Sequence, residues 1–362
     1  MKQTIERIVS IRVMALAVVL AAGFGTNDVY AAKGRDSPSY TLQVLSLPAG
    51  FTAASDVNIN DRHEIVGTVR VGPSGWHSQA VYWADATAAP MLLPCPTSEP
   101  CESRATGINN NGVISGSVDQ EAVLWHPTGG SWTLEVLPNP CQLDETSWTM
   151  ANDVLDDGTA GGSCDPTVTT FALNEIPVVW GAYTSEPAEL PVPEGFLDGR
   201  LGRINSSNDA VGTVRVNDGT DPTWNYGALW INDDGTYVTM ALTYFVNDIA
   251  PRVTDGYSFL VASDVGRLRV WKDVDSWTFA VDADAGGPGY GINAAGDMVG
   301  AVTKGGTSGS TPYLLTASGK LTKLPLPRGA TGTAVSVSSD QWVAGRLDLK
   351  TEYPAAVWIP PR

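Results

Sequence analysis

The stretch ATGINNNGVISGSVDQEAVLWHPTGGSWTLEVLP, Ala105–Pro138, shows the repeating unit of this protein. It contains a segment ending in Ile-Asn, a polar turn, a V-x-G-like strand, a strand closing on Trp and a strand closing on Leu-Pro. Asn and Gly tolerate positive φ, so the polar turn predicts a hairpin between antiparallel strands. Short apolar runs separated by turn residues predict β-structure with little helix.

The same four-part unit recurs along the chain. Its third strand ends at seven comparable positions, and the intervals between them run from 41 to 55 residues. These positions are Trp83, Trp125, Trp180, Trp230, Trp271, Leu315 and Trp358. A period near 45 residues with four short strands per unit is typical of β-propeller blades. We expect the repeated tryptophans to pack between blades rather than to contact a ligand.

The N-terminal end of the repeat region copies only the last piece of the unit. Ser39–Pro48 reads SYTLQVLSLP, which is similar to SWTLEVLP at the end of the quoted stretch. Seven turns and seven Trp-type strands follow, but only six closing strands, and the seventh unit ends at AAVWIPPR. The sequence therefore predicts an all-β, seven-bladed propeller in which the N-terminal strand completes the last blade and covers its edge. The fifth unit matches the repeat least well.

The first residues are typical of an export signal. Basic residues precede a short apolar run, Val13–Gly25, and a small-x-small pattern ends at Ala31. Because the run is too short to cross a bilayer, it predicts a cleaved signal peptide at 1–31, and a secreted or periplasmic protein without membrane insertion. We expect a spacer at 32–38 and one propeller domain at 39–362, acting as a monomer. Its predicted parts are the closing strand at 39–48 and blades at about 49–96, 97–140, 141–193, 194–243, 244–284, 285–327 and 328–362.

Charge and cysteine content narrow the class of protein further. The net charge of −17 argues against binding to nucleic acid or to an anionic membrane surface. Four cysteines, Cys95, Cys101, Cys141 and Cys164, predict two disulfides in an oxidising compartment. Three connectivities are possible, and the pairing of near neighbours (95 with 101, 141 with 164) is favoured. No Cys/His cluster has zinc-site spacing.

The units GINNNGVISGSV…EAVLW and GINAAGDMVGAV resemble the HAF-type extracellular repeat of exported bacterial proteins. That family's pattern is roughly G-I-N-x-x-G-x-V-x-G, a spacer, H-A-F-L-W and a closing D-L-G or L-P strand. The similarity extends over the whole mature chain and is most specific at 107–109 and 291–293. The chain departs from the family where it reads QAVYW or EAVLW, without the His. The resemblance implies export and a propeller-like repeat, and no shared biochemical activity.

Loop length predicts the face that binds a ligand. In such a blade the turns between strands one and two share one face, called here the tight-turn face, with the three-to-four connections. The two-to-three connections and the links between blades lie on the opposite, long-loop face, which holds all the long connections. Aromatic and charged side chains there suit a carbohydrate or an extracellular protein, although they could equally pack their own loops. The candidate ligand-binding residues are Trp76, His77, Trp148, Arg200, Arg203, Asp221, Trp224, Tyr226, Asp248 and Arg252.

Signals for catalysis are weak. Of the three histidines only His77 is expected on the long-loop face, and no G-x-S-x-G motif is present. We therefore expect a binding or interaction module rather than an enzyme. The alternative is a polysaccharide-degrading enzyme on the same face, either a lyase with His77 as base and Tyr226 or Tyr290 as acid, or a glycoside hydrolase with paired carboxylates.

Signals for a bound metal are similarly weak. Asp218 with Asp221, and Asp282 with Asp284, place oxygen ligands in or beside Gly-bearing loops, which calcium could use. Neither pair has the spacing of an EF-hand loop, so ordinary Asx turns are favoured. We expect no cofactor, with calcium as the alternative.

Overall fold

The computed structural model divides the chain into two parts, Met1–Ser37 and Pro38–Arg362. It describes residues 39–71, 77–96, 101–141, 147–166, 174–182, 186–216, 225–242, 245–249, 260–264, 267–273, 278–283, 289–303 and 310–362. All of these belong to the second part, and the predicted signal peptide lies outside them. Within these ranges no helix has the length and apolar character needed to cross a membrane.

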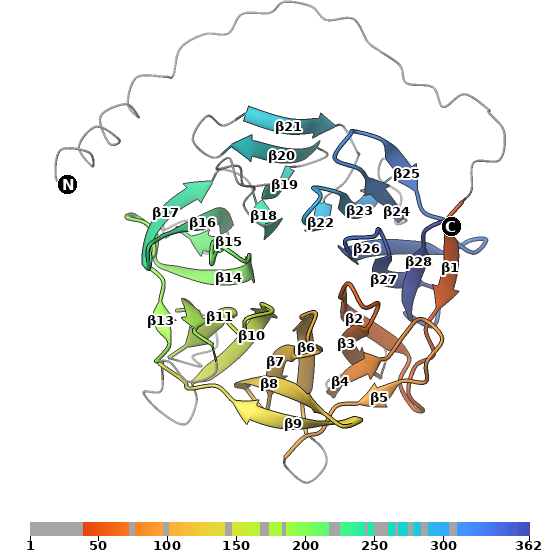
Figure 1. Cartoon of the computed structure of the whole chain (residues 1–362), viewed down its shortest axis with the longest axis horizontal. Coiled ribbons are helices and arrows are strands. Elements are labelled where there is room, and N and C mark those ends of the chain that lie inside the picture. Colours follow the sequence, from red (N-terminus) through yellow and green to blue (C-terminus); the bar gives the residue numbers. More distant parts are fainter. Residues whose placement is uncertain are drawn as a thin grey trace, which may run out of the picture. The chain divides into compact units, whose positions relative to one another are not determined.

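The described residues form 28 short strands in seven four-stranded antiparallel sheets. In Figure 1 the sheets stand side by side. In six of them the first strand along the chain lies nearest the centre and the last toward the rim, and in the seventh β26 lies nearest the centre and β1 at the rim. Within these ranges no residue is helical, so the all-β prediction is confirmed. From the centre outward the sheets are β2 (Ala53–Ile59), β3 (Ile65–Arg70), β4 (Ser78–Trp83) and β5 (Met91–Leu92); β6 (Ser103–Ile108), β7 (Ile114–Val118), β8 (Glu121–Thr128) and β9 (Ser131–Val136); β10 (Trp148–Val154), β11 (Ala160–Asp165), β12 (Ile176–Trp180) and β13 (Ala188–Glu189); β14 (Asp198–Ile204), β15 (Ala210–Arg215), β16 (Asn225–Asp233) and β17 (Thr236–Leu242); β18 (Phe245–Ile249), β19 (Leu260–Asp264), β20 (Arg267–Asp273) and β21 (Thr278–Ala283); β22 (Gly289–Ile292), β23 (Met298–Thr303), β24 (Ser310–Leu315) and β25 (Leu321–Lys323); and β26 (Thr331–Val337), β27 (Val343–Asp348), β28 (Ala355–Ile359) and β1 (Thr41–Val44).

The seventh of these sheets combines the two ends of the repeat region. Strand β1 pairs antiparallel with β28, with Thr41 opposite Ile359 and Val44 opposite Ala356. The pairing extends past β1, because the Leu45 amide donates to the Ala355 carbonyl at 2.9 Å. The N-terminal strand is therefore the outermost strand beside the last unit.

Each described tryptophan of the repeat joins its own sheet to the outer strand of the sheet before it. These five indoles are at most 1% exposed, so the expected packing between sheets is confirmed for them. Every indole N–H donates to a backbone carbonyl just after that outer strand, at 2.8–2.9 Å. The pairs are Trp83 with Ser46, Trp125 with Pro94, Trp180 with Pro138, Trp230 with Pro191, and Trp358 with Pro325. Ser46 follows β1, so the segment after the N-terminal strand accepts the indole hydrogen bond from the first sheet. The segments after the other outer strands accept the equivalent bond from the sheet that follows each of them.

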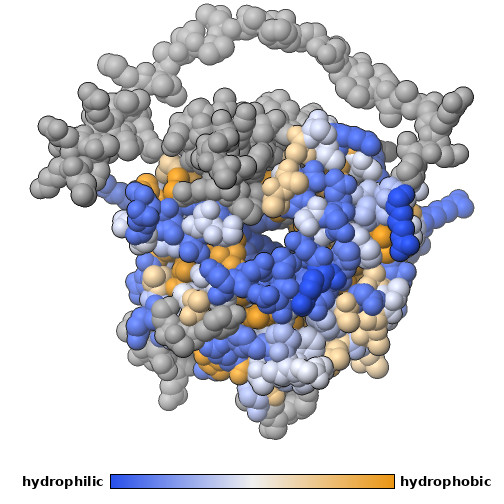
Figure 2. All heavy atoms as spheres, in the orientation of Figure 1, coloured by the Kyte–Doolittle hydropathy of each residue, from blue (hydrophilic) through white to orange (hydrophobic). Residues whose placement is uncertain are grey.

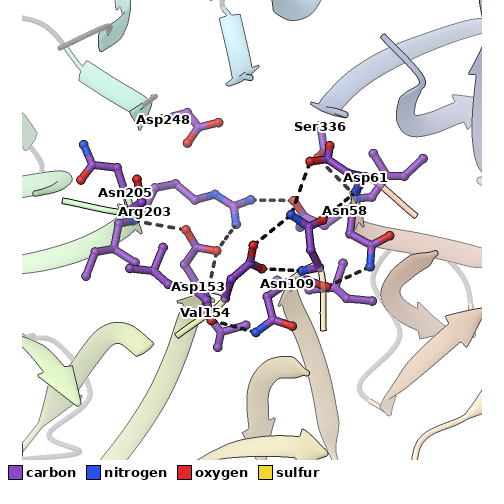
Figure 3. Close-up of a pocket in the computed structure, with 18 of the residues that line it drawn as sticks. Asn58, Asp61, Asn109, Asp153, Val154, Arg203, Asn205, Asp248 and Ser336 are labelled. Atoms are coloured by element: carbon purple, nitrogen blue, oxygen red, sulfur yellow. Dashed lines mark hydrogen bonds and ion pairs between the residues drawn. The ribbon is translucent and has the colours of Figure 1, made fainter. Parts of the chain in front are cut away.

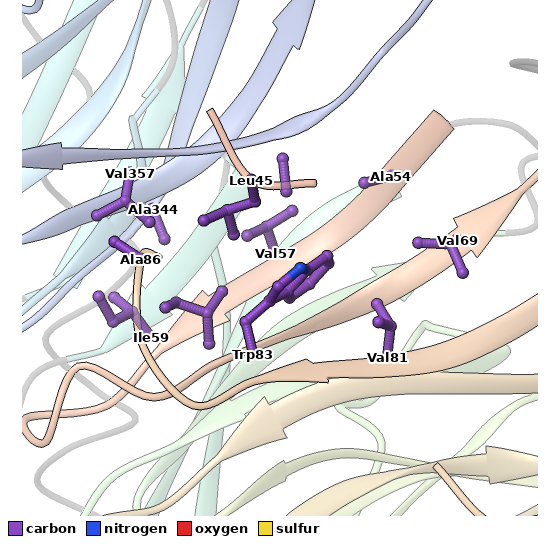
Figure 4. Close-up of a cluster of buried hydrophobic side chains, with 12 residues drawn as sticks. Leu45, Ala54, Val57, Ile59, Val69, Val81, Trp83, Ala86, Ala344 and Val357 are labelled. Atoms are coloured by element: carbon purple, nitrogen blue, oxygen red, sulfur yellow. The ribbon is translucent and has the colours of Figure 1, made fainter. Parts of the chain in front are cut away.

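Trp83 lies in an apolar cluster between the first and last sheets. Figure 4 shows Trp83 surrounded by aliphatic side chains of its own sheet, with Ala344 and Val357 contributed by the last sheet. Leu45, which follows β1, belongs to this cluster and is 2% exposed. The N-terminal strand is thus fixed by apolar packing as well as by hydrogen bonds.

The repeated V-x-G glycine is required by the close approach of the tryptophan and the inner strand. A Cβ at Gly116 would overlap the carbonyl oxygen of Arg104 and lie 2.8 Å from the ring of Trp125. A Cβ at Gly162 would meet the corresponding carbonyl of Met150 and lie 2.9 Å from Trp180. Only glycine fits at these positions, which explains why the letter recurs in the repeat.

The Asn of the Ile-Asn pair builds its own turn, and at Asn60, Asn109 and Asn293 it also binds the next sheet. The Asn109 side-chain oxygen accepts hydrogen bonds from the amides of Asn111 and Val113, at 3.0 and 2.9 Å. Its side-chain NH₂ donates to the Leu155 carbonyl in the next turn at 2.7 Å. Asn60 makes the equivalent bond to the Asn109 carbonyl at 2.9 Å. The most specific letters of the repeat therefore hold neighbouring sheets together.

The turns of the first and last sheets also contact each other. His63 stacks on Trp342 with ring centroids 3.9 Å apart and an angle of 13° between the rings. His63 Nε2 lies 2.9 Å from Asp340 Oδ2, and the Ser338 hydroxyl donates to Asp340 Oδ1 at 2.6 Å. Burial by itself would raise the pKa of Asp340, but the hydrogen bonds from Ser338 and His63 lower it below its ordinary value.

Both disulfides follow the favoured pairing. Cys95 bonds Cys101 with a Cα–Cα distance of 6.5 Å, and Cys141 bonds Cys164 with a Cα–Cα distance of 5.9 Å. The first disulfide lies in the link between β5 and β6, and the second ties the link after β9 to β11. Both therefore hold inter-sheet links on the long-loop face.

Replacement of Trp83 by Phe tests the seating of the N-terminal strand. Trp83→Phe keeps an aromatic ring but leaves the Ser46 carbonyl without its donor, so we expect a loss of about 1–3 kcal/mol in the free energy of unfolding. Trp125→Phe is the matched control, because it removes the equivalent bond within the body of the repeat. Urea denaturation should give similar losses for both variants. A loss confined to Trp125→Phe would contradict the docking of Ser46 on the first sheet.

Acid titration tests the contact between the first and last sheets. Because the pKa of Asp340 is lower in the folded state than in the unfolded state, its contribution to stability is present above about pH 4 and is lost as the pH falls below that value. Its side chain is 54% exposed, so we expect a small effect. Asp340→Asn should lower the free energy of unfolding near neutral pH and reduce its decline in acid. Identical pH profiles for the two proteins would contradict this assignment.

Candidate functional site

Every inner strand has a β-bulge near its C-terminal end. The register of the pairing with the neighbouring strand shifts just before the second-to-last residue of the inner strand. In β10 the shift lies between Ala151 and Asp153, and in β14 it lies between Leu201 and Arg203. The same shift occurs in β2, β6, β18, β22 and β26. A bulge changes the direction of the side chain that follows it. Figure 3 shows the result, since Asn58, Asp153, Arg203, Asp248 and Ser336 surround one cavity.

Two cavities lie along the channel between the inner strands. The turn-side cavity, of about 450 Å³, is lined by the ends of these strands and by the tight turns. The mouth cavity, of about 460 Å³, is lined by residues along these strands, from Arg104, Met150 and Arg200 near their starts onward, and by none of the tight turns, so it lies nearer the long-loop face. Asn58 and Arg203 line both cavities. Figure 2 shows that hydrophilic residues surround the hollow at the centre of the face in view.

Arg203 crosses the channel between these cavities. Its Nη2 donates to Asn58 Oδ1 at 2.9 Å, and its Nη1 donates to the Thr106 carbonyl at 3.3 Å and lies 3.5 Å from Asp153 Oδ1. One side chain from β14 therefore joins β2, β6 and β10 (Figure 3). The side chains of Arg203 and Asp153 are only 19% and 18% exposed, so both charges are largely withdrawn from water.

The carboxylates around Arg203 keep its guanidinium group protonated. Burial by itself would lower the pKa of Arg203, but the carboxylates of Asp153, Asp248 and Asp56 raise it, so the guanidinium is charged. Burial raises the pKa of Asp153, and the attraction of Arg203 offsets this only in part. Asp248 is also held in place, because its Oδ2 accepts a hydrogen bond from the Ile292 amide at 2.9 Å.

The two ends of the channel differ in charge. The turn-side cavity is lined by five carboxylates, those of Asp61, Asp153, Asp156, Asp157 and Asp248, against Arg203 alone. The mouth cavity is lined by Arg104, Arg200 and Arg203 against the single carboxylate of Asp56. The mouth is thus a basic site on an otherwise strongly acidic protein.

A groove adjoins the mouth cavity on the long-loop face. Its volume is about 300 Å³, and it shares Arg104, Met150 and Arg200 with the mouth cavity. Trp148 also lines it, together with the largely buried Glu175. Burial raises the pKa of Glu175, and the charge of Arg200 partly opposes that shift. The groove therefore combines an indole, two guanidinium groups, the carboxyl groups of Glu102 and Glu175, and uncharged polar side chains.

Two predicted ligand-binding residues meet in this groove and two others do not. Trp148 and Arg200 both line it, although one comes from β10 and the other from β14. Tyr226 instead packs edge-on against Phe196 with ring centroids 5.6 Å apart, and both rings lie against the apolar core around Trp230. His77 is exposed, and of the three cavities described none is lined by it.

The placement of Arg203 and Asp248 differs from the expectation. Both were expected on the long-loop face, but the structure places them in the channel, where both line the turn-side cavity. The reason is that β14 and β18 include these residues, and the bulge before each residue turns its side chain inward. The remaining candidates, Trp76, Asp221, Trp224 and Arg252, lie outside the described residues.

Arg104 and Glu175 are site residues that the sequence did not reveal. Arg104 and Arg200 both stand five residues before the turn position held by Asn109 and Asn205. Aligning the units residue by residue would have paired these arginines. Nothing comparable marks Glu175, which lies immediately before β12 and reaches the groove only through the fold.

Comparison with known proteins supports the fold class. No family model and no curated protein matches this sequence. Among solved structures, YCF48 bound to a D1 peptide aligns with a TM-score of 0.53 at 11% identity, covering 91% of this chain and 97% of that one. The Cps50 (Swd1) β-propeller domain of Myceliophteria thermophila gives 0.54 at 10% identity, covering 88% and 99%. The β-propeller domain of the Trilobed protease of Pyrococcus furiosus gives 0.54 at 10%, covering 86% and 94%.

These similarities confirm the prediction of an all-β propeller. At such identities they show the fold alone, and the ligands of those proteins say nothing about this chain.

Removal of Arg203 tests the charge balance of the channel. Arg203→Met leaves Asp153 buried without its partner, so we expect a loss of about 3 kcal/mol in the free energy of unfolding near neutral pH. The pKa of Asp153 in this variant rises further, so the deficit should shrink in acid, where the carboxyl is protonated. Adding Asp153→Asn should restore part of the loss at neutral pH. A double variant no more stable than Arg203→Met would contradict the pairing.

Proposed function

We propose that the seven sheets are the blades of a closed ring, a seven-bladed propeller completed by its N-terminal strand. The pairing of β1 with β28 and the bond from Trp83 to Ser46 support closure of this ring. Two disulfides and the signal-like N-terminus support export to an oxidising compartment, in the periplasm or outside the cell. The repeated G-I-N turns support membership of the HAF-type repeat proteins.

The protein acts as a monomeric binding module, and its ligand, a carbohydrate or an extracellular protein, lies on the long-loop face. The observation that carries this proposal is the groove beside the channel mouth, where Trp148 and Arg200 meet although they come from different blades. Its volume of about 300 Å³ falls at the lower end of the range of ligand pockets. The disulfides hold links on the same face, which keeps the groove preformed.

An enzyme that cleaves a polysaccharide in the same groove is the second candidate. One observation favours it, namely that burial raises the pKa of Glu175, as in carboxyl groups that act as general acids. A retaining or inverting hydrolase also needs a second carboxylate across the bond to be cleaved. Glu102 lines the groove as well, so the pair Glu102 and Glu175 is the one to examine.

Loss of the indole at the groove tests the binding proposal. Trp148→Ala removes the flat apolar surface, so it should weaken binding to the ligand by about tenfold or more. His126→Ala, on the tight-turn face, is the control and should bind normally. The measurement is a screen of the mature chain against glycans, polysaccharides and extracellular proteins, with calcium present, followed by titration of each hit.

Four outcomes of this screen decide between the proposals. Saturable binding that depends on Trp148 supports the module, and new reducing or unsaturated chain ends after incubation would instead establish the enzyme. Binding that is unchanged in Trp148→Ala but lost in His126→Ala would overturn the assignment to the long-loop face. Failure to bind any probe would sink the carbohydrate ligand over the range screened.

A further inference from the structure

Arg104 and Arg200 are equivalent residues of two blades separated by a third. Both stand five residues before the turn position of their inner strand, and Met150 holds the same position in β10 between them. Both arginines line the mouth cavity and the groove, so they lie where the two spaces join. Mouth and groove therefore form one trough with a guanidinium group from each side.

These two guanidinium groups have few protein partners. Within the described residues Arg104 makes no side-chain hydrogen bond or ion pair, and it is exposed. Arg200 lies 3.9 Å from Glu175 Oε2, beyond hydrogen-bond distance, and its side chain is 46% exposed. By contrast, Arg215 forms an ion pair with Asp198. Among the described residues the trough thus presents two charged donor groups, Arg104 without a hydrogen bond or ion pair and Arg200 in a long ion pair with Glu175.

A carboxylate is the group that these donors fit. A guanidinium group binds a carboxylate through two parallel N–H···O bonds, and a site lined by basic residues concentrates anions even on an acidic protein. Deeper in the mouth, Arg203 adds a third positive charge. Three acidic residues also line the trough, Asp56 in the mouth and Glu102 and Glu175 in the groove. Burial raises the pKa of Glu175, which weakens its opposing charge.

The remaining lining favours a sugar chain over a peptide. Ser78, Ser117, Gln120 and Thr149 offer hydroxyl and amide groups, which match the hydroxyls of a sugar ring. Trp148 adds one flat apolar surface, which suits the apolar face of such a ring. An acidic peptide would instead need an apolar pocket for an anchoring side chain, and only Trp148 and Met150 supply apolar surface here.

We propose that the trough binds an acidic polysaccharide, a chain built of uronic acids, whose carboxylates pair with Arg104 and Arg200 while a neighbouring ring stacks on Trp148. This inference rests on the proposed function, because it names the ligand class for the same long-loop face. It goes beyond that function because it assigns a negative charge to the ligand and names the two arginines that bind the ligand's carboxylates.

The probes that test this are polygalacturonate and its methyl-esterified form, which differ only in the charge of the carboxyl groups. Calorimetric titration of the mature chain should show saturable binding of polygalacturonate that weakens with added salt, and much weaker binding of the ester. Arg104→Ala and Arg200→Ala should each weaken binding of polygalacturonate by about tenfold or more. Arg328→Ala is the matched control, since Arg328 is exposed in the link between β25 and β26, on the same face.

The fold of each variant is checked by thermal denaturation, and none should change the melting temperature appreciably because these arginines are exposed. Equal binding of polygalacturonate and its ester, lost in Trp148→Ala but kept in both arginine variants, would overturn the acidic ligand and leave the proposed function intact. Poly-glutamate binding as tight as polygalacturonate would overturn the sugar class. No binding to either pectin form, with a neutral glycan or protein bound elsewhere, would overturn both proposals.

Discussion

The hydrogen bond from each of the five described indoles of the repeat to the segment after the outer strand of the preceding sheet is the interaction on which much of this structure depends. A four-stranded sheet cannot bury both of its faces alone, and the indole fills the space between two sheets while its N–H fixes their register. Trp83 depends on Ser46 for this bond, so the N-terminal strand is part of the packing system rather than an appendage. In the five sheets with a described indole, the position of the inner strand beside the channel follows from this packing.

Given that packing, the bulge in each inner strand provides a place for functional variation. The flanking residues, such as Ile204 and Asn205, are held by the core and by the turn, whereas the residue after the bulge faces the channel. The chain places Asp153, Arg203 and Asp248 at such positions, and the channel becomes acidic toward the tight turns. Five residues before the turn, Arg104 and Arg200 make the opposite end basic. One scaffold thereby supports two chemically different openings.

The placement of Arg203 and Tyr226 differs from the expectation for reasons that lie in the fold. Nothing in the sequence around Arg203 shows that β14 already begins at Asp198, so this residue lies within an inner strand and lines both channel cavities. Its direction then depends on a bulge, which no single-sequence pattern reveals. Tyr226 resembled an exposed aromatic in a loop, yet it is the second residue of β16 and packs on Phe196 from the preceding link. Trp148 lines the groove because it is the first residue of an inner strand, and these first residues lie at the long-loop face.

The sequence by itself determined the repeat, the all-β class, the place of the N-terminal strand beside the last unit and the disulfide pairing of near neighbours. These features depend on the period of the repeat, on the residue types in the turns and on the distance between residues along the chain. All three are properties of the amino-acid sequence itself. Only the tertiary structure decided which side chains share a cavity. The joining of Arg104 to Arg200, and of Arg203 to Asn58 and Asp153, brings together residues about 50 to 145 positions apart. Their proximity follows from blade packing, which no stretch of the sequence encodes alone.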